Sequence, residues 1–423
     1  MRSAVLTVIL GLFATSAVAA VPTDPSACRR GGRLYFSQRL FEKAIEQFEC
    51  AVQGKPEDAE AWLGLANSYC EVGRFQDAAV AYAKADSTAE KKKLKEDVAN
   101  NREHYWGVEM THGMTLVQKA DKEAQSDSAA VYQEALTHFD NALLLDANKR
   151  QVYIYRGYIL SKLGRGDESV GAFEQAVALP ATDDESDQKA LENAKTNLQA
   201  AYKQRASDAS RGETVEELEI AAGYYEKVLA IDADSSDVNT LFGLANVHYQ
   251  IAKKDSTRVD ESLGKAAELY EKVLEKLGDD EDTLYNLTLV YIEKDAFDNA
   301  QRIANKLIAI DPKKTDGHNL MRIIYARRGD SKSSLAEALV VGALEKGTPI
   351  ETGTLEDELK KSYGPSSDAL AIIKEKGKPD EARSHDAEGI KIDTFFYWSR
   401  GEAVAFSNGN RVATVKFEPV TKG

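Results

Sequence analysis

The chain has 423 residues, far more than one ordinary compact domain needs, so it is long enough for a large core or for several domains. It carries 54 basic and 69 acidic residues, which gives a net charge of −15. A net-acidic chain lacks the positive surface by which proteins bind nucleic acid or anionic lipid, so neither is an expected partner. We interpret the negative charge as a solvated helical surface rather than as an acidic recognition face.

Residues 1–20 have the pattern of a secretory signal peptide. Arg2 is followed by an apolar run from Ala4 to Ala14, and Ala17-Val18-Ala19 supplies the small residues of a cleavage site. The run is short for a membrane span, and no later segment is long and apolar enough for one. We therefore expect a protein that crosses the inner membrane and is periplasmic, either soluble or peripherally associated with the outer membrane.

The three cysteines are then expected in an oxidising compartment. Cys28 and Cys50 lie at similar distances on either side of the turn of the first helical pair, so a disulfide between them is geometrically allowed. Cys70 lies further along the next helix and would stay unpaired. The alternative is that all three are small buried apolar residues.

From residue 26 to residue 346 the apolar positions follow the helical period. Residues of the same kind also recur at a fixed interval, which we call the repeat length: Gly32 and Phe48 reappear as Ala66 and Tyr82. A unit of this length with small residues facing large ones predicts two antiparallel helices. Such a pair cannot bury its own apolar face, so we expect the pairs to stack into a solenoid.

The order of residue types resembles the tetratricopeptide repeat (TPR) family: a bulky residue, a Leu-small pair, an aromatic, an alanine, a second aromatic, a second alanine and a closing proline. The first two repeats, 25–90, carry it closely, and the stretch 318–344 resembles a degenerate last repeat. The resemblance implies a mainly α fold, with about eight repeats over residues 21–347.

Three of these repeats have elongated helix pairs. In a regular repeat the number of residues between the small residue and the second aromatic is the same as that between Gly32 and Phe48. In the elongated repeats the same two positions lie much further apart, in the segments 107–139, 199–225 and 245–270. Because the added sequence is polar and falls at the turn within a pair, we favour lengthened surface loops, which cost little. The alternative is a one-sided fringe that contacts a partner.

Residues 348–423 have a different pattern, which predicts a small α+β module. A polar connector with some helical character (351–363) and a short helix (366–377) precede three strands at 392–398, 403–406 and 412–417. The Asn408-Gly409 step is a strong hairpin signal. A three-stranded meander is too small to be stable unless a helix or the solenoid covers it.

This module also resembles, faintly, the SmpA/OmlA (BamE-like) family of envelope lipoproteins. The shared features are Gly377-Lys378-Pro379 after a helix, the aromatic strand Phe395-Phe396-Tyr397-Trp398, and the closing hairpin at Asn408-Gly409. The resemblance implies a link to outer-membrane assembly. The module lacks the lipidated cysteine of that family.

The sequence contains no catalytic or cofactor-binding signature, so we expect neither an enzyme nor a cofactor. His104 and His112 are eight positions apart on a predicted helix, with Met110 and Met114 nearby. That spacing turns a helix about 80° beyond two full turns, which separates the two rings. We therefore predict no metal site.

The TPR resemblance implies that the first helix of each pair lines an inner groove. Apolar and amide side chains mixed in this way could hold an extended peptide or a partner helix. Capture of a peptide carboxylate is not expected, because two arginines and Gly64 stand where the family has Lys and Asn. The candidate groove residues are Arg29, Arg33, Phe36, Leu63, Asn67, Glu71, Tyr158, Phe242, Asn246, Tyr249, Tyr285 and Leu289.

The leading hypothesis is thus a non-enzymatic scaffold of the bacterial cell envelope that binds protein partners. A second hypothesis is that the C-terminal module binds a small molecule or a glycan, or acts enzymatically, with Phe395, Tyr397 and Trp398 as a platform and the TPR array positioning the module. A third is homo-oligomerisation through an edge of the solenoid. The sequence identifies none of these partners.

Overall fold

The computed structural model describes residues 24–122, 125–231 and 237–419, so the predicted signal peptide lies outside the described residues. The chain divides into two compact units, residues 1–198 and residues 199–423. The boundary falls within one long helix, α9 (Glu185–Ala209).

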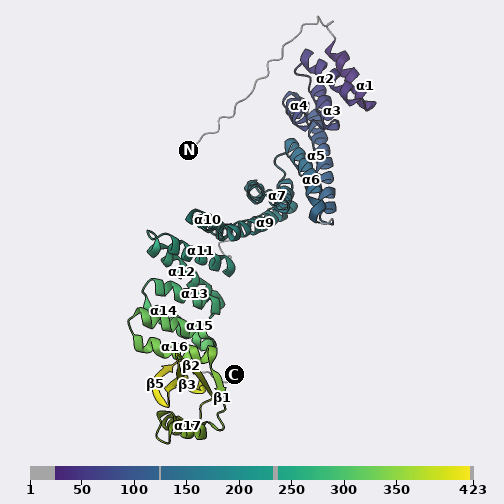
Figure 1. Cartoon of the computed structure of the whole chain (residues 1–423). Helices are drawn as coiled ribbons and strands as arrows, with labels where there is room; N and C mark the ends of the chain where they lie inside the picture. Colours follow the sequence, from purple (N-terminus) through teal and green to yellow (C-terminus); the bar gives the residue numbers. More distant parts are fainter. Residues whose placement is uncertain (1–23, 123–124, 232–236, 420–423) are drawn as a thin grey trace. The chain divides into compact units, whose positions relative to one another are not determined.

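The first unit is built from helical hairpins (Figure 1). Four pairs and the start of a fifth are described, and in each complete pair the second helix packs on the first. Their bounds are α1 (Pro25–Ser37), α2 (Phe41–Gly54), α3 (Ala59–Glu71), α4 (Phe75–Thr88), α5 (Lys92–Ala120), α6 (Gln125–Leu145), α7 (Arg150–Lys162) and α8 (Gly166–Ala178), followed by the first part of α9.

The second unit continues with hairpins and ends in a sheet (Figure 1). Together with the first unit, the described residues form eight consecutive helical pairs, which confirms the predicted repeat architecture. The helices that follow α9 are α10 (Val215–Ile231), α11 (Val238–Lys254), α12 (Val259–Leu277), α13 (Glu281–Glu293), α14 (Phe297–Ile310), α15 (Thr315–Arg327) and α16 (Ser331–Lys346).

Small residues facing aromatic rings set the packing of the pairs. The ring of Phe48 is 1 % exposed and lies between Gly32 of its own pair and Gly64 of the next. A Cβ at Gly64 would lie 2.3 Å from Phe48 Cζ, so only glycine lets the helices approach this closely. Gly157 faces Phe173 in the same way. The close packing of the helices therefore depends on glycines, which have no side chain, as much as on large aromatic side chains.

The added sequence of the elongated pairs lies mainly in helices, so the expectation of lengthened loops is wrong. α5 has 29 residues and α9 has 25, whereas α1, α3 and α7 have 13 each. The connection between α11 and α12 is residues 255–258, hardly longer than the connection between α1 and α2, residues 38–40. A polar sequence with good helix formers extends the helix instead of looping out.

The third repeat is also displaced from its predicted alignment. Gly107, expected to face Phe139, has open space beside it, and Gly113 lies against that ring instead. The start of α5 keeps the repeat length, because Asn67 is hydrogen-bonded to Asn101, the residue one repeat length further on. α5 therefore has two parts, of which the first stacks on the second repeat and the second packs on α6.

The C-terminal sheet has five antiparallel strands in the order β1-β2-β3-β4-β5, rather than the predicted three. Their bounds are β1 (Thr348–Ile350), β2 (Glu381–Ala387), β3 (Ile390–Tyr397), β4 (Glu402–Ser407) and β5 (Asn410–Lys416). The helices α17 (Leu355–Tyr363) and α18 (Asp368–Lys376) lie between β1 and β2 in sequence. Asn408 and Gly409 both have positive φ, as the predicted tight turn between β4 and β5 requires.

Both faces of the sheet are buried. Phe395 and Phe406 pack with α17 and α18 on one face. Phe396 and Val415 pack with Val340 of α16 on the other. The last helix of the array is therefore part of the core of the module, which explains how so small a sheet is stable. Among the described residues, no helix combines the length and apolarity that a membrane span requires.

Candidate functional site

Four of the predicted groove residues line one open hollow in the first unit. Arg33 and Phe36 come from α1, and Leu63 and Asn67 come from α3. The hollow has a volume of about 270 Å³. Its remaining lining residues are Phe48, Glu60, Gly64, Leu94 and Asp97.

The start of α5 supplies one wall that the sequence analysis missed. Leu94 and Asp97 belong to it, and Asp97 stands one repeat length after Leu63. The segment 92–105 has few apolar residues, so it was not recognised as the first helix of a repeat. Counting one repeat length onward from the groove residues of α3 would have found it.

Ion pairs within the chain occupy both predicted arginines, of which Arg33 lines the hollow and Arg29 does not. Arg29 bonds Asp58 at 2.8 and 2.9 Å, and it lies 3.0 Å from Glu60. Arg33 bonds Glu60 at 2.6 Å. A peptide carboxylate would have to displace these partners, which supports the expectation that carboxylate capture is not the mode of binding. With Asp97 present, the charged groups lining the hollow sum to one negative charge.

Hydrogen bonds fix the orientation of Asn67. Its Oδ1 accepts from the Tyr82 hydroxyl at 2.7 Å, and its Nδ2 donates to Asn101 Oδ1 at 3.0 Å. Burial raises the pKa of Tyr82, so that hydroxyl keeps its proton as a donor. These two bonds fix the orientation of the Asn67 amide group. One of its two Nδ2 hydrogens is used in the bond to Asn101, and the other is not.

The other candidates of the first unit lie outside this hollow. Glu71 accepts a hydrogen bond of 2.8 Å from Tyr105, which is again one repeat length further on. Tyr158 is half-buried and donates to Asp121 at 2.8 Å. Both residues therefore connect one helical pair to another through a phenol–carboxylate bond.

The candidates of the second unit are mostly packing residues. Phe242, Tyr249 and Leu289 lie against the hydrophobic core of that unit, and Asn246 accepts a hydrogen bond from the Tyr270 hydroxyl. Tyr285 is exposed and lines a separate hollow with acidic neighbours. These residues do not extend the hollow of the first two repeats.

The aromatic strand of the module does not form a binding platform. Phe395, Tyr397 and Trp398 are 0 %, 2 % and 8 % exposed. β3 is covered on both faces, so Phe395 and Tyr397 are core residues, and Trp398, which begins the 3-10 turn after β3, packs in the cluster between the sheet and α16. The observation that suggested a ligand-binding module is thereby removed.

The structure joins Cys28 of α1 to Cys50 of α2 by a disulfide, with their Cα atoms 5.9 Å apart. Cys70 is a free buried cysteine. Burial raises the pKa of its thiol to about 12, so it stays protonated and weakly reactive.

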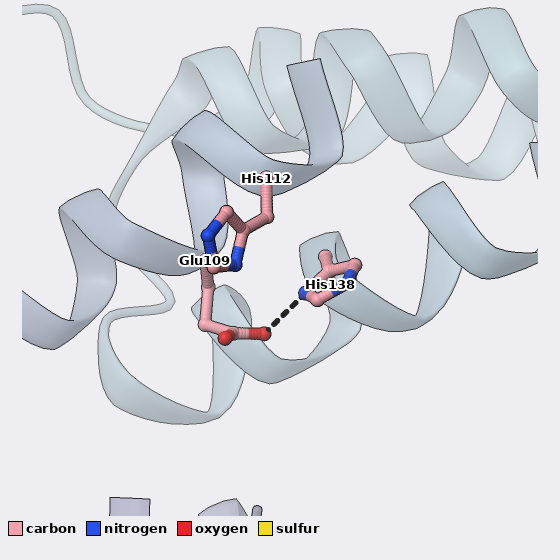
Figure 2. A group of neighbouring side chains, drawn as sticks. All are labelled: Glu109, His112 and His138. Atoms are coloured by element: carbon pink, nitrogen blue, oxygen red, sulfur yellow. Dashed lines mark hydrogen bonds and ion pairs between the residues drawn. The ribbon is translucent and has the colours of Figure 1, made fainter. Parts of the chain in front are cut away.

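Two histidines and one carboxylate lie close together between α5 and α6 (Figure 2). The ligand atoms of Glu109, His112 and His138 all lie within 4.8 Å of one another. His138 Nδ1 is 2.8 Å from Glu109 Oε2, as the dashed line in Figure 2 marks. The sequence analysis paired His112 with His104 instead and missed His138, because His138 lies on the other helix of the pair.

Family models of the tetratricopeptide repeat match residues 29–90 and 260–324. These two segments lie in different units, and each spans helices that the structure forms as hairpins. The chain therefore contains tetratricopeptide repeats in both segments. Arrays of this kind are protein-binding scaffolds, and the TPR repeats support that role for the chain. No curated protein matches the sequence significantly.

Solved TPR structures are similar to parts of the chain. YrrB, described as a TPR protein with an unusual peptide-binding site, is 14 % identical over 49 % of this chain and 92 % of its own, with a TM-score of 0.33. The C-terminal part of a TPR protein from Cytophaga hutchinsonii is 16 % identical over 75 % and 95 %, with a TM-score of 0.33. A thermophilic TPR protein from Thermus thermophilus is 20 % identical over 53 % and 98 %, with a TM-score of 0.23.

Proposed function

We propose that this TPR protein is an exported, non-enzymatic scaffold that holds an extended peptide or a helix of a protein partner in the hollow of its first two repeats. The observation that carries the proposal is the convergence of Arg33, Phe36, Leu63 and Asn67 on that hollow. Side chains from three successive first helices surround it, which suits a ligand that crosses the repeats.

The lining indicates the chemistry of the peptide. Phe36, Leu63 and Leu94 offer apolar surface for one aliphatic or aromatic side chain. Glu60 and Asp97 outnumber the single arginine, so a basic residue beside the apolar anchor would be favoured. The fixed amide of Asn67 can bond a peptide carbonyl. We therefore expect a segment in which a large apolar residue stands next to Lys or Arg.

Two features support placement in the bacterial envelope. Residues 1–20 have the signal-peptide pattern, and the Cys28–Cys50 pair is suited to an oxidising compartment. The faint BamE-like resemblance of the module points the same way and stays a prediction. Cell fractionation of the native host, followed by mass spectrometry of the mature N-terminus, tests export: a chain that still begins at Met1 in the cytosol would contradict it.

The test of binding is an affinity capture with chemical crosslinking from an envelope extract of the native host. Leu63→Glu places a charge in the apolar part of the hollow and should abolish capture of the specific partner. Val80→Glu is the matched control, because Val80 is 55 % exposed on the second helix of the same repeat and does not line the hollow.

The proposed groove predicts that wild type and Val80→Glu recover the same protein and that Leu63→Glu does not. A partner retained by Leu63→Glu would overturn the assignment of the hollow. If crosslinked wild type repeatedly recovered no specific protein, the scaffold proposal itself would fail. Circular dichroism of each variant checks that the helices are intact.

A further inference from the structure

The junction of α5 and α6 brings together three side chains that commonly bind transition metals. We propose that Glu109, His112 and His138 form a binding site for a divalent transition-metal ion, zinc in the first instance. The proposal is independent of the peptide hollow, since none of the three residues lines it.

The helix geometry presents the ligands to one point. Glu109 and His112 are three positions apart on α5, so they differ by about 60° around the helix axis and share a face. His138 comes from the facing helix α6 (Figure 2). The three ligand atoms already lie within 4.8 Å of one another.

Only a small adjustment separates this arrangement from coordination. Zinc binds imidazole nitrogen and carboxylate oxygen at about 2.0–2.2 Å, so the ligand atoms of a tetrahedral site lie roughly 3.3 Å apart. His112 is exposed and its side chain can rotate without disturbing the core. Glu109 and His138, whose atoms are 2.8 Å apart, are already close enough.

Electrostatics favour a cation at this position. The Glu109 carboxylate is only 6 % exposed, and burial of a carboxylate is costly unless it is paired. His138 and the Asn141 amide lie 2.8 and 2.9 Å from its Oε2. A metal ion would add a full positive charge beside the carboxylate, while Asn141 holds the carboxylate in place.

The donor set decides which metal fits. Two imidazoles and one carboxylate are typical of zinc and neighbouring transition metals, whereas Ca²⁺ and Mg²⁺ prefer oxygen ligands alone. Three protein ligands leave the fourth position for a water molecule. Solvent can reach it, because His112 and Thr111 also line an open hollow along α5.

The test is a titration of tag-free, EDTA-treated protein with Zn²⁺ by isothermal calorimetry. Wild type should bind one zinc ion, and His112→Ala should weaken binding at least about tenfold. The matched control is His104→Ala, which removes an exposed histidine two turns earlier on the same helix and should leave the affinity unchanged. His112→Ala is expected to fold, since His112 is exposed.

One further variant and two further measurements make the result decisive. His138→Ala should show the same loss, and thermal unfolding of wild type should shift upward with zinc while His112→Ala does not respond. Co²⁺ should give the visible absorption of a four-coordinate ion in wild type and in His104→Ala, but not in His112→Ala or His138→Ala. Absence of zinc binding by wild type, or equal binding by wild type and His112→Ala, would overturn the proposal. So would a loss in His104→Ala as large as that in His112→Ala.

Discussion

Gly64 lies where the ring of Phe48 meets the first helix of the next repeat. This contact leads us to predict that replacing a helical glycine by alanine destabilises the fold here. Alanine in a helix interior is normally more stable than glycine by about 0.5–1 kcal/mol. At Gly64 the added methyl group would overlap the Phe48 ring, so Gly64→Ala should cost about 1–3 kcal/mol instead.

Gly107 is the matched control for this substitution. It is also helical, and a Cβ there would meet nothing within 4 Å. Gly107→Ala should therefore raise the urea midpoint of unfolding, whereas Gly64→Ala should lower it. If both substitutions moved the midpoint in the same direction, the packing of Phe48 would not be as described.

His248 makes the stability of the second unit depend on pH. Burial, reinforced by the positive charge of Lys265, lowers the pKa of His248 to about 4 from an ordinary value near 6.5. The unfolded chain therefore takes up a proton at a higher pH than the folded chain does. This contribution is fully present above about pH 6.5 and is lost as the pH falls through about 4.

His248→Gln isolates this effect from the carboxylates that also titrate in acid. Wild type should lose about 2 kcal/mol more stability than the variant between pH 7 and pH 4, after allowance for solvent screening. Denaturant unfolding at several pH values measures the difference. Parallel pH profiles for the two proteins would count against a neutral, buried His248.

Particular residues also show how far the site could be predicted. Arg33, Phe36, Leu63 and Asn67 were found because each occupies a family position in a regular repeat. Leu94 and Asp97 were missed because a polar helix gives no apolar period. The histidine cluster was missed for a different reason: the partners of His112 depend on how α5 and α6 are aligned, and the spacing within one helix does not contain that information.

At the scale of the element, the disulfide joins the two helices of the first repeat. The bonded cysteines are 22 residues apart, and closing a loop of that size stabilises a fold by about 3 kcal/mol. Reduction, or Cys50→Ser, should therefore lower the urea midpoint of the first unit. Cys70→Ser serves as the control, and reducing agent should still lower its urea midpoint.

Alkylation distinguishes the three cysteines directly. Protein exported by its host should take up one iodoacetamide label when unfolded without reductant, at Cys70. The folded protein should react slowly at pH 8, because burial holds the pKa of that thiol at about 12. Three labels on the unfolded, unreduced protein would show that Cys28 and Cys50 are not bonded.

Elements were predicted well where at least one face is apolar and poorly elsewhere. The helical pairs and β5 have one apolar face, and β3 and β4 are apolar on both faces over most of their length. β2 was missed because only Ala382 among its residues is buried, so its sequence has no apolar alternation. β1 is three residues long and contains Pro349, which is unfavourable inside a strand.

At the scale of the whole molecule, the sheet closes the last repeat. Val415 of β5 is 6 % exposed and packs in the cluster that contains Val340 of α16, whereas Val412 of the same strand is 43 % exposed. Val415→Asp should cost several kcal/mol and promote aggregation, because it places a charge between the sheet and α16. Val412→Asp should be nearly neutral.

Thermal unfolding and light scattering of the two variants measure this difference. A chain ending at Lys346 should behave like Val415→Asp, since it exposes the apolar face of α16. Residues 351–423 alone should not fold stably either, because one face of the sheet would lose its cover. Equal stability of Val415→Asp and Val412→Asp would contradict the close packing of sheet on helix.

The covered face of α16 has a consequence for self-association. Head-to-tail stacking of arrays needs an open apolar face at each end, and the sheet covers the face of α16 that carries Ala336, Val340 and Ala343. Contact between like ends of two copies is the alternative to head-to-tail stacking. Such a contact is two-fold and stops at the dimer, whereas unlike ends would build a filament. Because the sheet covers the face of α16 that a following array would need, light scattering should find no ladder of higher species.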